Sequence, residues 1–311
     1  MQSVKVVVRI RPEFRQEADL GLGLCVGPGL DSNTVELSTN FDEGDDAQSI
    51  YSFRFARVFD EDTPQEEIHK TVSLPLVASV LDGYNACILA YGQTGSGKTH
   101  TMLGEHYSDL GGDFDLTTQQ FKPKRAAAQT HDFSSLRSSD GLIPRMLHEI
   151  FAAINTNPDP SRLLVRASFI EIYNEHVRDL LLPQPLKADQ NLRLREAACG
   201  LWVTGATEVL VESMVQVMEL LHRGGKNRTT AATLSNAVSS RSHAIFVVGV
   251  IRQVEDAEYR RSQLYLVDLA GSEKLAKTGA EDDRLTEAKS INQSLLALGK
   301  VALISSAGTV S

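Results

Sequence analysis

The sequence has few cysteines, and none of them stands in a metal-binding spacing. Cys25, Cys87 and Cys199 are the only three in 311 residues, they are far apart, and no two form a CxxC pair. This distribution argues against a disulfide framework and against a cysteine zinc site. The eight histidines form no HExxH-like pair. We therefore expect any catalytic metal to arrive with a substrate.

Long apolar runs and an excess of positive charge are also missing. No segment approaches the roughly 18 residues that a transmembrane helix needs, and the opening MQSVKVVVRIRP lacks the basic-then-apolar order of a signal peptide. The formal net charge of −9 gives no electrostatic basis for general nucleic-acid binding. We expect a soluble, cytoplasmic chain without a nucleic-acid or membrane partner, which binds any acidic partner through locally concentrated basic groups.

The length and composition fit a large mixed domain. The chain has 42% hydrophobic and 23% charged residues, both ordinary values for a globular protein. Strand-like and helix-like patterns alternate without an internal repeat, which predicts an α/β fold with a central, mostly parallel twisted sheet and helices on both faces. The segments with strand patterns are 4–10, 86–90, 163–173, 243–251 and 263–268, and 31–59 resembles a hairpin-bearing lobe.

The helix that precedes the second of these strands has clear start signals. Thr63, Pro64 and Glu66 stand in the order N-cap, first-turn proline and capping-box glutamate. This order predicts a helix that runs towards Gly83. A break is expected near Pro75, because proline removes a backbone donor and clashes with the preceding turn.

Two further helices are expected later in the chain. Ser213 and Gln216 can open one of them, and Gly224 and Gly225 can end it. Residues 285–303 have the apolar periodicity of a long final helix.

The least structured stretch is 105–140, which is rich in polar residues and glycine. Loops of this length are uncommon within a domain and are either functional or disordered. We expect one long surface loop, inserted into a single domain that spans residues 1–311, and we expect the ends of its segment 113–138 to lie close together.

A glycine-rich motif directly follows the strand predicted at 86–90. Residues 92–99 read GQTGSGKT and match GxxxxGK[ST], in the strand-turn-helix context that this motif requires. Glycines allow backbone N–H groups to turn towards phosphate oxygens, Lys98 can reach the terminal phosphates, and Thr99 can bind Mg²⁺. The motif predicts a nucleotide site, against the alternative of a chance glycine-rich turn.

Two later segments offer the other parts of a nucleotide-hydrolysing site. The apolar strand LYLVD ends at Asp268, as a Walker-B strand does, although such an ending is common by itself. Gly271 can offer its backbone N–H to a γ-phosphate, and Glu273 can pair with a cation or order water. The run NAVSSRSH at 236–243 sets three hydroxyls around Arg241, a group suited to phosphate oxygens, Mg²⁺ and water rather than merely to a solvated loop.

Together these motifs resemble those of kinesin motor domains. GQTGSGKT, NAVSSRSH and DLAGSE occur in the family's order after RIRP at 9–12, and FIEIYNE at 169–175 and KTGAE at 277–281 are also similar. The resemblance covers almost the whole chain. It implies a P-loop NTPase fold, ATP and Mg²⁺ as ligands, and microtubule-stimulated ATP hydrolysis that drives movement.

The resemblance also implies which residues bind the nucleotide. The adenine would lie between the RIRP segment and His100, although Arg9 at a strand edge and His100 on a helix surface also have plain structural interpretations. The implied nucleotide-binding residues are Arg9, Arg11, Pro12, Gly92, Gln93, Thr94, Gly95, Ser96, Gly97, Lys98, Thr99, His100 and Ser239.

The metal and catalytic positions are implied in the same way. Mg²⁺ would be held by Thr99, by Ser240 and, through water, by Asp268. The family pattern implies an ion pair between Arg241 and Glu273 that closes around ATP, with water as the nucleophile. Hydrolysis would then depend on positioning and charge stabilisation rather than on a strong base. The implied catalytic residues are Ser240, Arg241, Gly271 and Glu273.

The implied filament partner is the microtubule, whose surface is acidic. Lys274, Lys277 and Lys289 stand where the resemblance places the filament contact, and Asn292 would link that helix to the second switch. A solvated helix face is otherwise the commoner explanation of such lysines.

One departure from the family pattern concerns the end of the sequence. Kinesin motor domains continue into a further helix, a central strand, another helix and a neck linker, whereas this sequence ends at Ser311. A truncated, non-motile nucleotide- or tubulin-binding module is therefore an alternative, and apolar groups around Ile88 are expected to be exposed at a sheet edge. An unrelated P-loop kinase or transporter-type ATPase fits the first motif alone. Oligomeric state, direction, processivity and cargo stay open.

Overall fold

The chain is described here from a computed structural model. Two units divide the described chain, an N-terminal unit that ends at Pro64 and a sheet unit that begins at Gln65. The predicted helix at 285–303 lies outside the described residues. Those residues are 4–19, 25–39, 49–104, 112–115, 120–123, 136–157, 163–182, 192–197, 200–234, 241–255 and 258–273.

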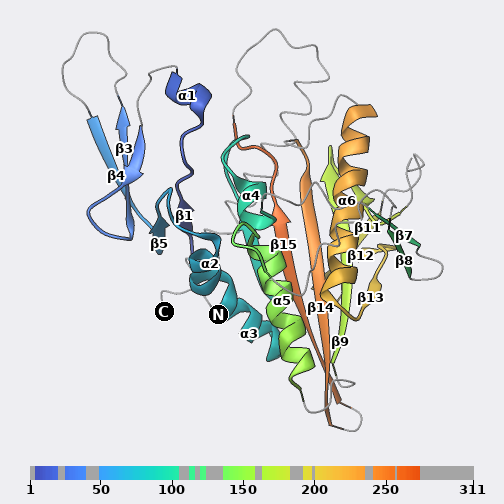
Figure 1. Ribbon diagram of the computed structural model, residues 1–311. Helices are drawn as coiled ribbons and strands as arrows, with labels where there is room; N and C mark the ends of the chain where they lie inside the picture. Colours follow the sequence, from blue (N-terminus) through green and yellow to red (C-terminus); the bar gives the residue numbers. More distant parts are fainter. Residues whose placement is uncertain are drawn as a thin grey trace. The chain divides into compact units, whose positions relative to one another are not determined.

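The N-terminal unit is a small β-rich lobe (Figure 1). Its elements are β1 (Val7–Arg9), α1 (Arg15–Asp19), β2 (Val26–Pro28), β3 (Thr34–Thr39), β4 (Ser49–Arg54) and β5 (Arg57–Phe59). β2, β3 and β4 form an antiparallel sheet, and β1 pairs in parallel with β5. The hairpin predicted within 31–59 is confirmed, whereas the opening strand is shorter than the predicted 4–10.

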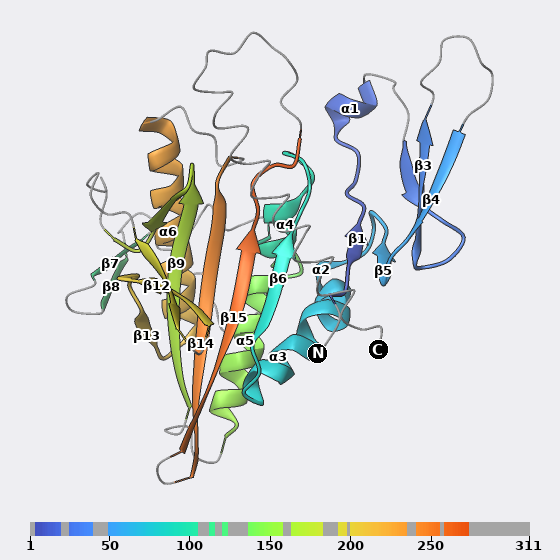
Figure 2. The ribbon, with the colours of Figure 1, turned by 180° about the vertical axis from the view of Figure 1, so that it is seen from behind.

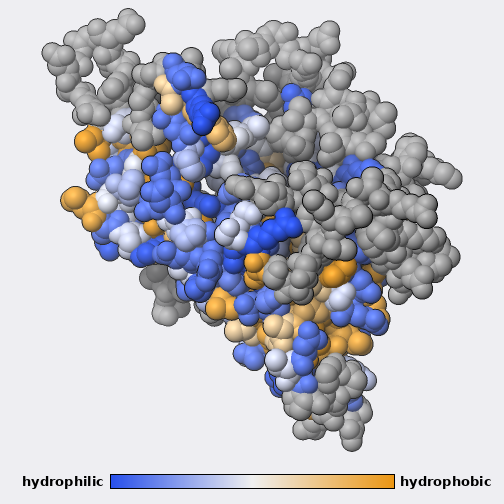
Figure 3. Space-filling view, in the orientation of Figure 1, coloured by the Kyte–Doolittle hydropathy of each residue, from blue (hydrophilic) through white to orange (hydrophobic). Residues whose placement is uncertain are grey.

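Much of the apolar surface in this lobe faces solvent. Tyr51 and Phe53 of β4 are 53% and 49% exposed, and they lie opposite Leu37 and Val35 of β3. Figure 3 shows separate apolar side chains among hydrophilic ones at the left of the visible face and a denser apolar group towards its lower right. Scattered exposed apolar residues are normal for a soluble surface.

The sheet unit contains a mixed six-stranded sheet with the order β10-β9-β14-β15-β6, in which β13 also pairs with β9. Its strands are β6 (Ala86–Ala90), β9 (Leu163–Tyr173), β10 (His176–Asp179), β13 (Val209–Val211), β14 (His243–Glu255) and β15 (Glu258–Asp268). The α/β class is confirmed, but among the described strands the sheet is mixed rather than mostly parallel. Among these described strands, β15 and β6 pair in parallel. The pairings of β9 with β10, β13 and β14, and of β14 with β15, are antiparallel.

Helices cover one face of this sheet in the described part of the chain. The helices of the unit are α2 (Gln65–Ile68), the π-helix η1 (His69–Ser73), α3 (Leu74–Leu81), α4 (Lys98–Met102), α5 (Leu142–Asn155) and α6 (Met214–Leu234). Figure 2 shows the other face, with the strands in front of α5 and α6. None of the described helices is long and apolar enough to cross a membrane.

The core lies between the sheet and these helices. Along β9, the buried residues Val165, Ala167 and Phe169 alternate with the exposed residues Leu164 and Arg166, as expected of a strand that buries one face. The rings of Phe169 and Phe246 meet edge to face with centroids 5.4 Å apart. This packing fixes β9 and β14 in the middle of the sheet.

The predicted end of α6 is wrong, because the helix runs through both glycines to Leu234. A Cβ added at Gly224 would lie 2.0 Å from Cδ1 of Phe169. Gly224 therefore permits close packing of the helix on β9 rather than ending the helix. The predicted start is confirmed, since the Gln216 side chain accepts a hydrogen bond from the Glu212 amide and the Ser213 hydroxyl accepts one from the Gln216 amide.

The predicted break near Pro75 is a π-helical turn instead. α2, η1 and α3 follow one another without a gap from Gln65 to Leu81, and Pro75 stands in the first turn of α3. Proline has no backbone N–H to donate to the preceding turn. The wider π-helical turn at His69–Ser73 tolerates this missing hydrogen bond, so the helix continues. The ring Nδ1 of His69 and the hydroxyl of Ser73 lie 2.7 Å apart within it.

The stretch 105–140 is not wholly irregular. Its described residues include a hairpin of β7 (Gly112–Asp115) and β8 (Gln120–Pro123). A second hairpin of the sheet unit pairs β11 (Arg193–Ala197) with β12 (Gly200–Thr204). Gly104 and Asp140, at the two boundaries of the stretch, form an antiparallel bridge. The approach of the ends of 113–138 stays a prediction.

β6 is the last strand at one side of the described sheet. Leu89 is 43% exposed and Tyr91 is 66% exposed, while Ile88 between Cys87 and Leu89 is half-buried. The expected exposure of apolar groups in this region is therefore present, mainly on the neighbours of Ile88. The same strand leads directly into the glycine-rich motif.

Candidate functional site

The glycine-rich motif forms a turn between β6 and α4. Gly95 and Gly97 have φ angles of 79° and 92°, a left-handed conformation that glycine adopts without strain. Gly97 is the N-cap residue of α4, which begins at Lys98. The loop geometry thus depends on glycine at these two positions, and Lys98 and Thr99 are the first two residues of the helix that follows.

Lys98 is folded over the loop that precedes it. Its Nζ donates hydrogen bonds to the carbonyl oxygens of Gly92 and Gln93 at 2.8 and 2.9 Å. Burial lowers the pKa of Lys98, while the carboxylates of Asp268 and Glu273 act in the opposite direction. A cation held over a glycine-rich loop is suited to contact terminal phosphate oxygens.

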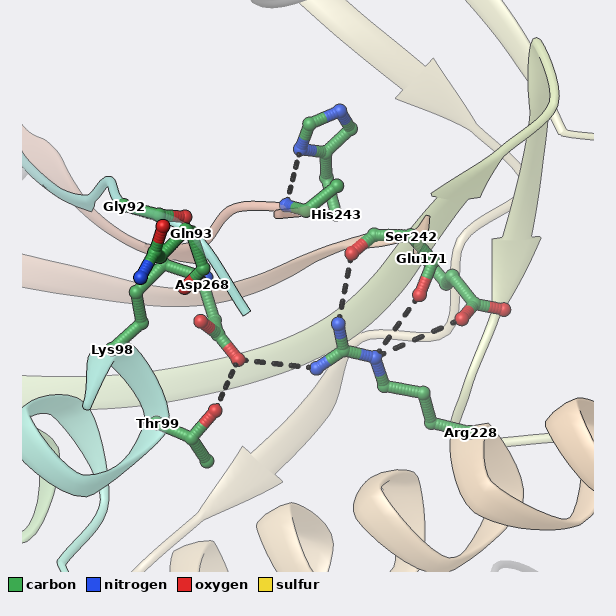
Figure 4. A network of polar contacts seen from close by, with 10 residues as sticks. Gly92, Gln93, Lys98, Thr99, Glu171, Arg228, Ser242, His243 and Asp268 are labelled. Atoms are coloured by element: carbon green, nitrogen blue, oxygen red, sulfur yellow. Dashed lines mark hydrogen bonds and ion pairs between the residues drawn. The ribbon is translucent and has the colours of Figure 1, made fainter. Parts of the chain in front are cut away.

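Asp268 lies beside Thr99 at the end of β15 (Figure 4). The parallel register sets Asp268 opposite Ala90, two residues before the loop begins. The Thr99 hydroxyl donates to Oδ2 of Asp268 at 2.9 Å. The other carboxylate oxygen, Oδ1, is buried and has no hydrogen-bond partner within the described segments. The structure thus brings these two predicted metal ligands together.

Arg228 of α6 is a member of this site that the sequence reasoning missed. Its guanidinium contacts Oδ2 of Asp268 at 3.2 Å and donates to the carbonyl of Ser242 at 2.8 Å and to the hydroxyl of Ser242 at 3.2 Å. Oε1 of Glu171 in β9 lies 3.8 Å from its Nε (Figure 4). The Arg228 side chain is 12% exposed, so this cation is largely buried between two carboxylates.

A sequence signal for Arg228 does exist. The predicted helix end at Gly224 and Gly225 places Arg228 outside the helix. In a continuous helix Arg228 stands four residues after Gly224 and so on the same face, the one that packs on β9. A glycine used for close packing, followed at this spacing by arginine, points to a cation against the sheet.

The segment after β15 is held against the glycine-rich loop. The carboxylate of Glu273 accepts hydrogen bonds from the Thr94 amide, at 2.9 Å, and from the Thr94 hydroxyl. The Ser272 amide donates to the Gly92 carbonyl at 3.1 Å. Partial burial raises the pKa of Glu273, but the hydrogen bonds from Thr94 outweigh it and the net shift is downward. Glu273 is therefore an anion that faces the loop.

His243 ties the same segment to β14. Its Nδ1 accepts a hydrogen bond from the Ala270 amide at 3.0 Å (Figure 4). Burial and then the nearby Arg228 lower the pKa of His243, against the opposing effects of Asp268 and Glu175. A neutral ring with an unprotonated Nδ1 fits this bond, since the amide is the donor.

The RIRP residues belong to the N-terminal unit. Arg11 forms a two-pronged ion pair with Glu17 and lies over the Phe14 ring, 4.2 Å from its centroid. The bond from Arg11 lowers the pKa of Glu17 to about 2. Arg9 is in β1, where burial lowers its pKa. Adenine contacts by Arg9, Arg11 and Pro12 stay a prediction.

Several predicted positions lie outside the described residues, namely Ser239, Ser240, Lys274, Lys277, Lys289 and Asn292. Arg241 is described, and its ion pair with Glu273 stays a prediction, because in this structure Glu273 accepts hydrogen bonds from Thr94. His100 lies in α4, and its backbone carbonyl accepts a hydrogen bond from the Gln65 side chain at 2.8 Å. No cluster of three or more His, Cys, Asp or Glu side chains that could hold a metal occurs in the described segments.

Comparison with known proteins identifies the fold and the family. The profile of the kinesin motor domain matches residues 9–308. The chain belongs to the kinesin motor domain family. A solved structure of a fast kinesin, published for its implications for the ATPase mechanism and for interactions with microtubules, has a TM-score of 0.72 and 38% sequence identity. The match covers 93% of this chain and 72% of that one.

Curated kinesins are similar over most of this chain. A kinesin heavy chain of Botryotinia fuckeliana is 40% identical over 301 residues, which are 96% of this chain and 30% of that protein. Kinesin-like protein 3 of Schizosaccharomyces pombe is 37% identical over 305 residues, which are 97% of this chain and 48% of that protein. The chain thus spans less than half the length of these kinesins. The predicted family and P-loop NTPase fold are confirmed.

Proposed function

We propose that this kinesin motor domain binds ATP with Mg²⁺, hydrolyses it, and couples the reaction to microtubule binding and movement. One observation carries the proposal. The glycine-rich loop is bonded directly to both functional positions around the end of β15, through Thr99 to Asp268 and through Thr94 to Glu273. A loop that holds phosphate is thereby joined to groups that can respond to the terminal phosphate.

The glycine-rich loop and Lys98 would bind the phosphates. The backbone of Gly92–Thr99 would supply N–H donors, and Lys98 would turn from the loop carbonyls to the β- and γ-phosphate oxygens. The two bonds that Lys98 now makes are to backbone acceptors of its own loop. Because phosphate carries formal negative charge, it is a stronger acceptor than these carbonyls.

Thr99 and Asp268 suit a magnesium ion. Their hydroxyl and carboxylate oxygens are the hard ligands that Mg²⁺ prefers, and Oδ1 of Asp268 is buried without a described partner. With no dedicated cage in the described segments, the ion would take its remaining ligands from phosphate and water. When bound, Mg²⁺ neutralises charge on the phosphates. Ser240 is the further ligand that the resemblance implies.

Hydrolysis would depend on the segment that follows Asp268. The Gly271 amide would donate to the γ-phosphate, and Glu273 would leave Thr94 to pair with Arg241 and order the attacking water. The present bonds from Thr94 keep Glu273 anionic and close to the loop. Water is positioned in this scheme rather than deprotonated by a strong base.

Microtubule binding would use a local basic surface, since the chain as a whole carries a formal net charge of −9. Lys274, Lys277 and Lys289 are the proposed contacts, placed by the resemblance. The non-motile binding module is not favoured, because a mere binding module does not require Glu273 and Asp268 to be bonded to the glycine-rich loop.

ATP turnover by the purified chain tests the proposal. We expect hydrolysis that requires Mg²⁺ and rises with added microtubules. Phosphate release is measured with and without taxol-stabilised microtubules at several salt concentrations, because a locally basic contact weakens as salt rises. Turnover that microtubules leave unchanged would contradict the coupling. Absence of any turnover despite nucleotide binding would favour the binding module.

A further inference from the structure

The short segment after β15 is held at four successive points. The Leu269 amide donates to the Ala90 carbonyl at 3.3 Å, and the Ser272 amide donates to the Gly92 carbonyl at 3.1 Å. Glu273 accepts from Thr94, as described above. The fourth bond runs from the Ala270 amide to Nδ1 of His243 at 3.0 Å. A stretch of irregular chain is thus fixed almost residue by residue.

His243 differs from the other three partners in its origin. Ala90, Gly92 and Thr94 are alternate residues of one run, the end of β6 and the glycine-rich loop, so their bonds hold the segment to that loop. His243 is the first residue of β14, directly after the NAVSSRSH run. Its bond therefore holds the segment to the central sheet, independently of the loop.

The bond is shielded from water. Ala270 is 0% exposed and His243 is 8% exposed. Water cannot replace the histidine as acceptor in such a place, so loss of Nδ1 would leave a buried amide without a partner. The chain around Ala270 would then have to move in order to solvate that amide.

The Gly271 amide lies between two of these bonded residues and differs from its neighbours. Ala270 and Ser272 donate to His243 and to Gly92, whereas no acceptor for the Gly271 amide is found in the described part of the chain. The Glu273 carboxylate lies close to this residue, because a Cβ built at Gly271 would be 2.3 Å from its Oε2. A donor without an acceptor, held between two fixed neighbours, is preorganised for an incoming oxygen.

We propose that His243 is a positioning residue for phosphate sensing: its Nδ1 anchors the Ala270 amide to β14, and this anchor aims the adjacent Gly271 amide at the terminal phosphate. The inference rests on the proposed ATPase function and adds to it a residue outside the predicted site. His243 touches neither nucleotide nor water in this scheme. It acts through the backbone of Ala270 and Gly271.

Three substitutions separate the anchor from simple packing. His243→Asn keeps an acceptor, Oδ1, near the position of Nδ1, whereas His243→Leu fills similar space without one. His243→Gln keeps polarity but places its amide one bond further out, and it serves if the leucine variant does not fold. His69→Leu is the matched control, because His69 is also buried and its Nδ1 also contacts a neighbour, the Ser73 hydroxyl, within η1.

The first readout is binding of ADP compared with binding of ADP plus aluminium fluoride, which mimics the transferred phosphoryl group. We expect His243→Leu and His243→Gln to weaken the aluminium fluoride complex roughly tenfold and ADP binding less than about twofold. His243→Asn should stay close to the unmodified protein, and His69→Leu should affect both ligands equally. Equal loss of both ligands in the His243 variants would overturn the proposal, and so would an unchanged aluminium fluoride complex.

The second readout does not require turnover. Amide hydrogen exchange of the nucleotide-free protein should be faster across 269–273 in His243→Leu than across the middle of β14, and near normal in His243→Asn. Uniform acceleration along β14, or no acceleration at 269–273, would show that His243 is no anchor. If the anchor is present but the unmodified chain does not hydrolyse ATP, then the proposed function fails and not the anchor.

Discussion

The glycine-rich loop and the Arg228 cluster meet at one atom, Oδ2 of Asp268, and are built in opposite ways. Thr99 reaches this oxygen from the loop, at 2.9 Å, and Arg228 reaches it from α6, at 3.2 Å. The loop is a contiguous run whose lysine bonds its own backbone. The cluster joins α6, β9, β15 and Ser242, the residue before β14, through one buried guanidinium.

The two regions should therefore contribute differently to nucleotide chemistry and to the stability of the fold. The loop contributes little to the core, so changes in it should mainly affect nucleotide chemistry. Arg228 is buried between Asp268 and Glu171, so changes in it should affect the stability of the fold as well. Substitutions in the two regions should therefore separate a loss of activity from a loss of stability.

Replacing the loop lysine should give the largest effect on activity. Lys98→Ala removes the cation nearest the phosphates, and we expect ATP turnover to fall at least about a hundredfold. The melting temperature without nucleotide should change little, because Lys98 bonds carbonyl groups that remain close to solvent. Turnover and thermal melting of one preparation check this. Turnover like that of the unmodified protein would remove Lys98 from the site.

Replacing the buried arginine should give the largest effect on stability. Arg228→Ala leaves the carboxylates of Asp268 and Glu171 without their shared cation, and we expect a loss of about 4 kcal/mol in the free energy of unfolding. Arg166→Ala is the matched control, since its ion pair with Glu208 is about half exposed and should contribute less than about 1 kcal/mol. Denaturant unfolding without nucleotide measures both. Equal effects would contradict the division.

Glu219 tests a buried charge of α6 that lacks such a partner. Burial raises the pKa of Glu219 to about 7, and its Oε2 has no hydrogen-bond partner within the described segments. The folded state therefore binds the proton more tightly than the unfolded state, whose glutamate has the ordinary value of 4.5. Stability should be highest below about pH 4.5 and fall as the pH rises through 7.

Glu219→Gln should remove this loss of folding stability at high pH. We expect the variant to be more stable than the unmodified protein by about 3 kcal/mol at pH 8 and by little at pH 4.5. Glu212→Gln, at an exposed position just before α6, is the control. Denaturant unfolding at both pH values decides, and a stabilisation independent of pH would refute this assignment.

Gly224 tests the packing that places Arg228. Gly224→Ala would set a methyl group against Phe169, and we expect a loss of about 2 kcal/mol. Gly249→Ala in β14 is the control, because a Cβ there would meet nothing closer than the Arg166 carbonyl at 3.9 Å. Melting curves of the two variants should differ clearly. Similar curves would mean that α6 and β9 can separate without cost.

The sequence predicts the glycine-rich loop, its flanking strand and helix, and its contact with Asp268. The strand before Gly92, the helix start at Lys98, and the approach of Asp268 to Thr99 follow from local patterns and from the parallel pairing of β6 and β15. Glycine in the left-handed region and a motif of fixed spacing carry this information within a few residues.

The sequence does not predict contacts that depend on packing between distant elements. Gly224 was expected to end α6, because a glycine spacer and a glycine cap look alike until Phe169 is placed opposite. The anchor from His243 to Ala270 and the cation at Arg228 depend on that same three-dimensional packing. The mixed strand directions were missed because periodicity gives no direction to a strand.

The most direct test of the proposed mechanism is the ATP affinity and the turnover of Glu273→Ala, measured on one preparation beside the unmodified protein. The account predicts that the dissociation constant for ATP changes less than about threefold while turnover falls at least about a hundredfold, since Glu273 acts on the attacking water and not on ground-state binding. Glu258→Ala, at the exposed start of β15, should match the unmodified protein in both. A parallel loss of affinity and turnover in Glu273→Ala would contradict the account.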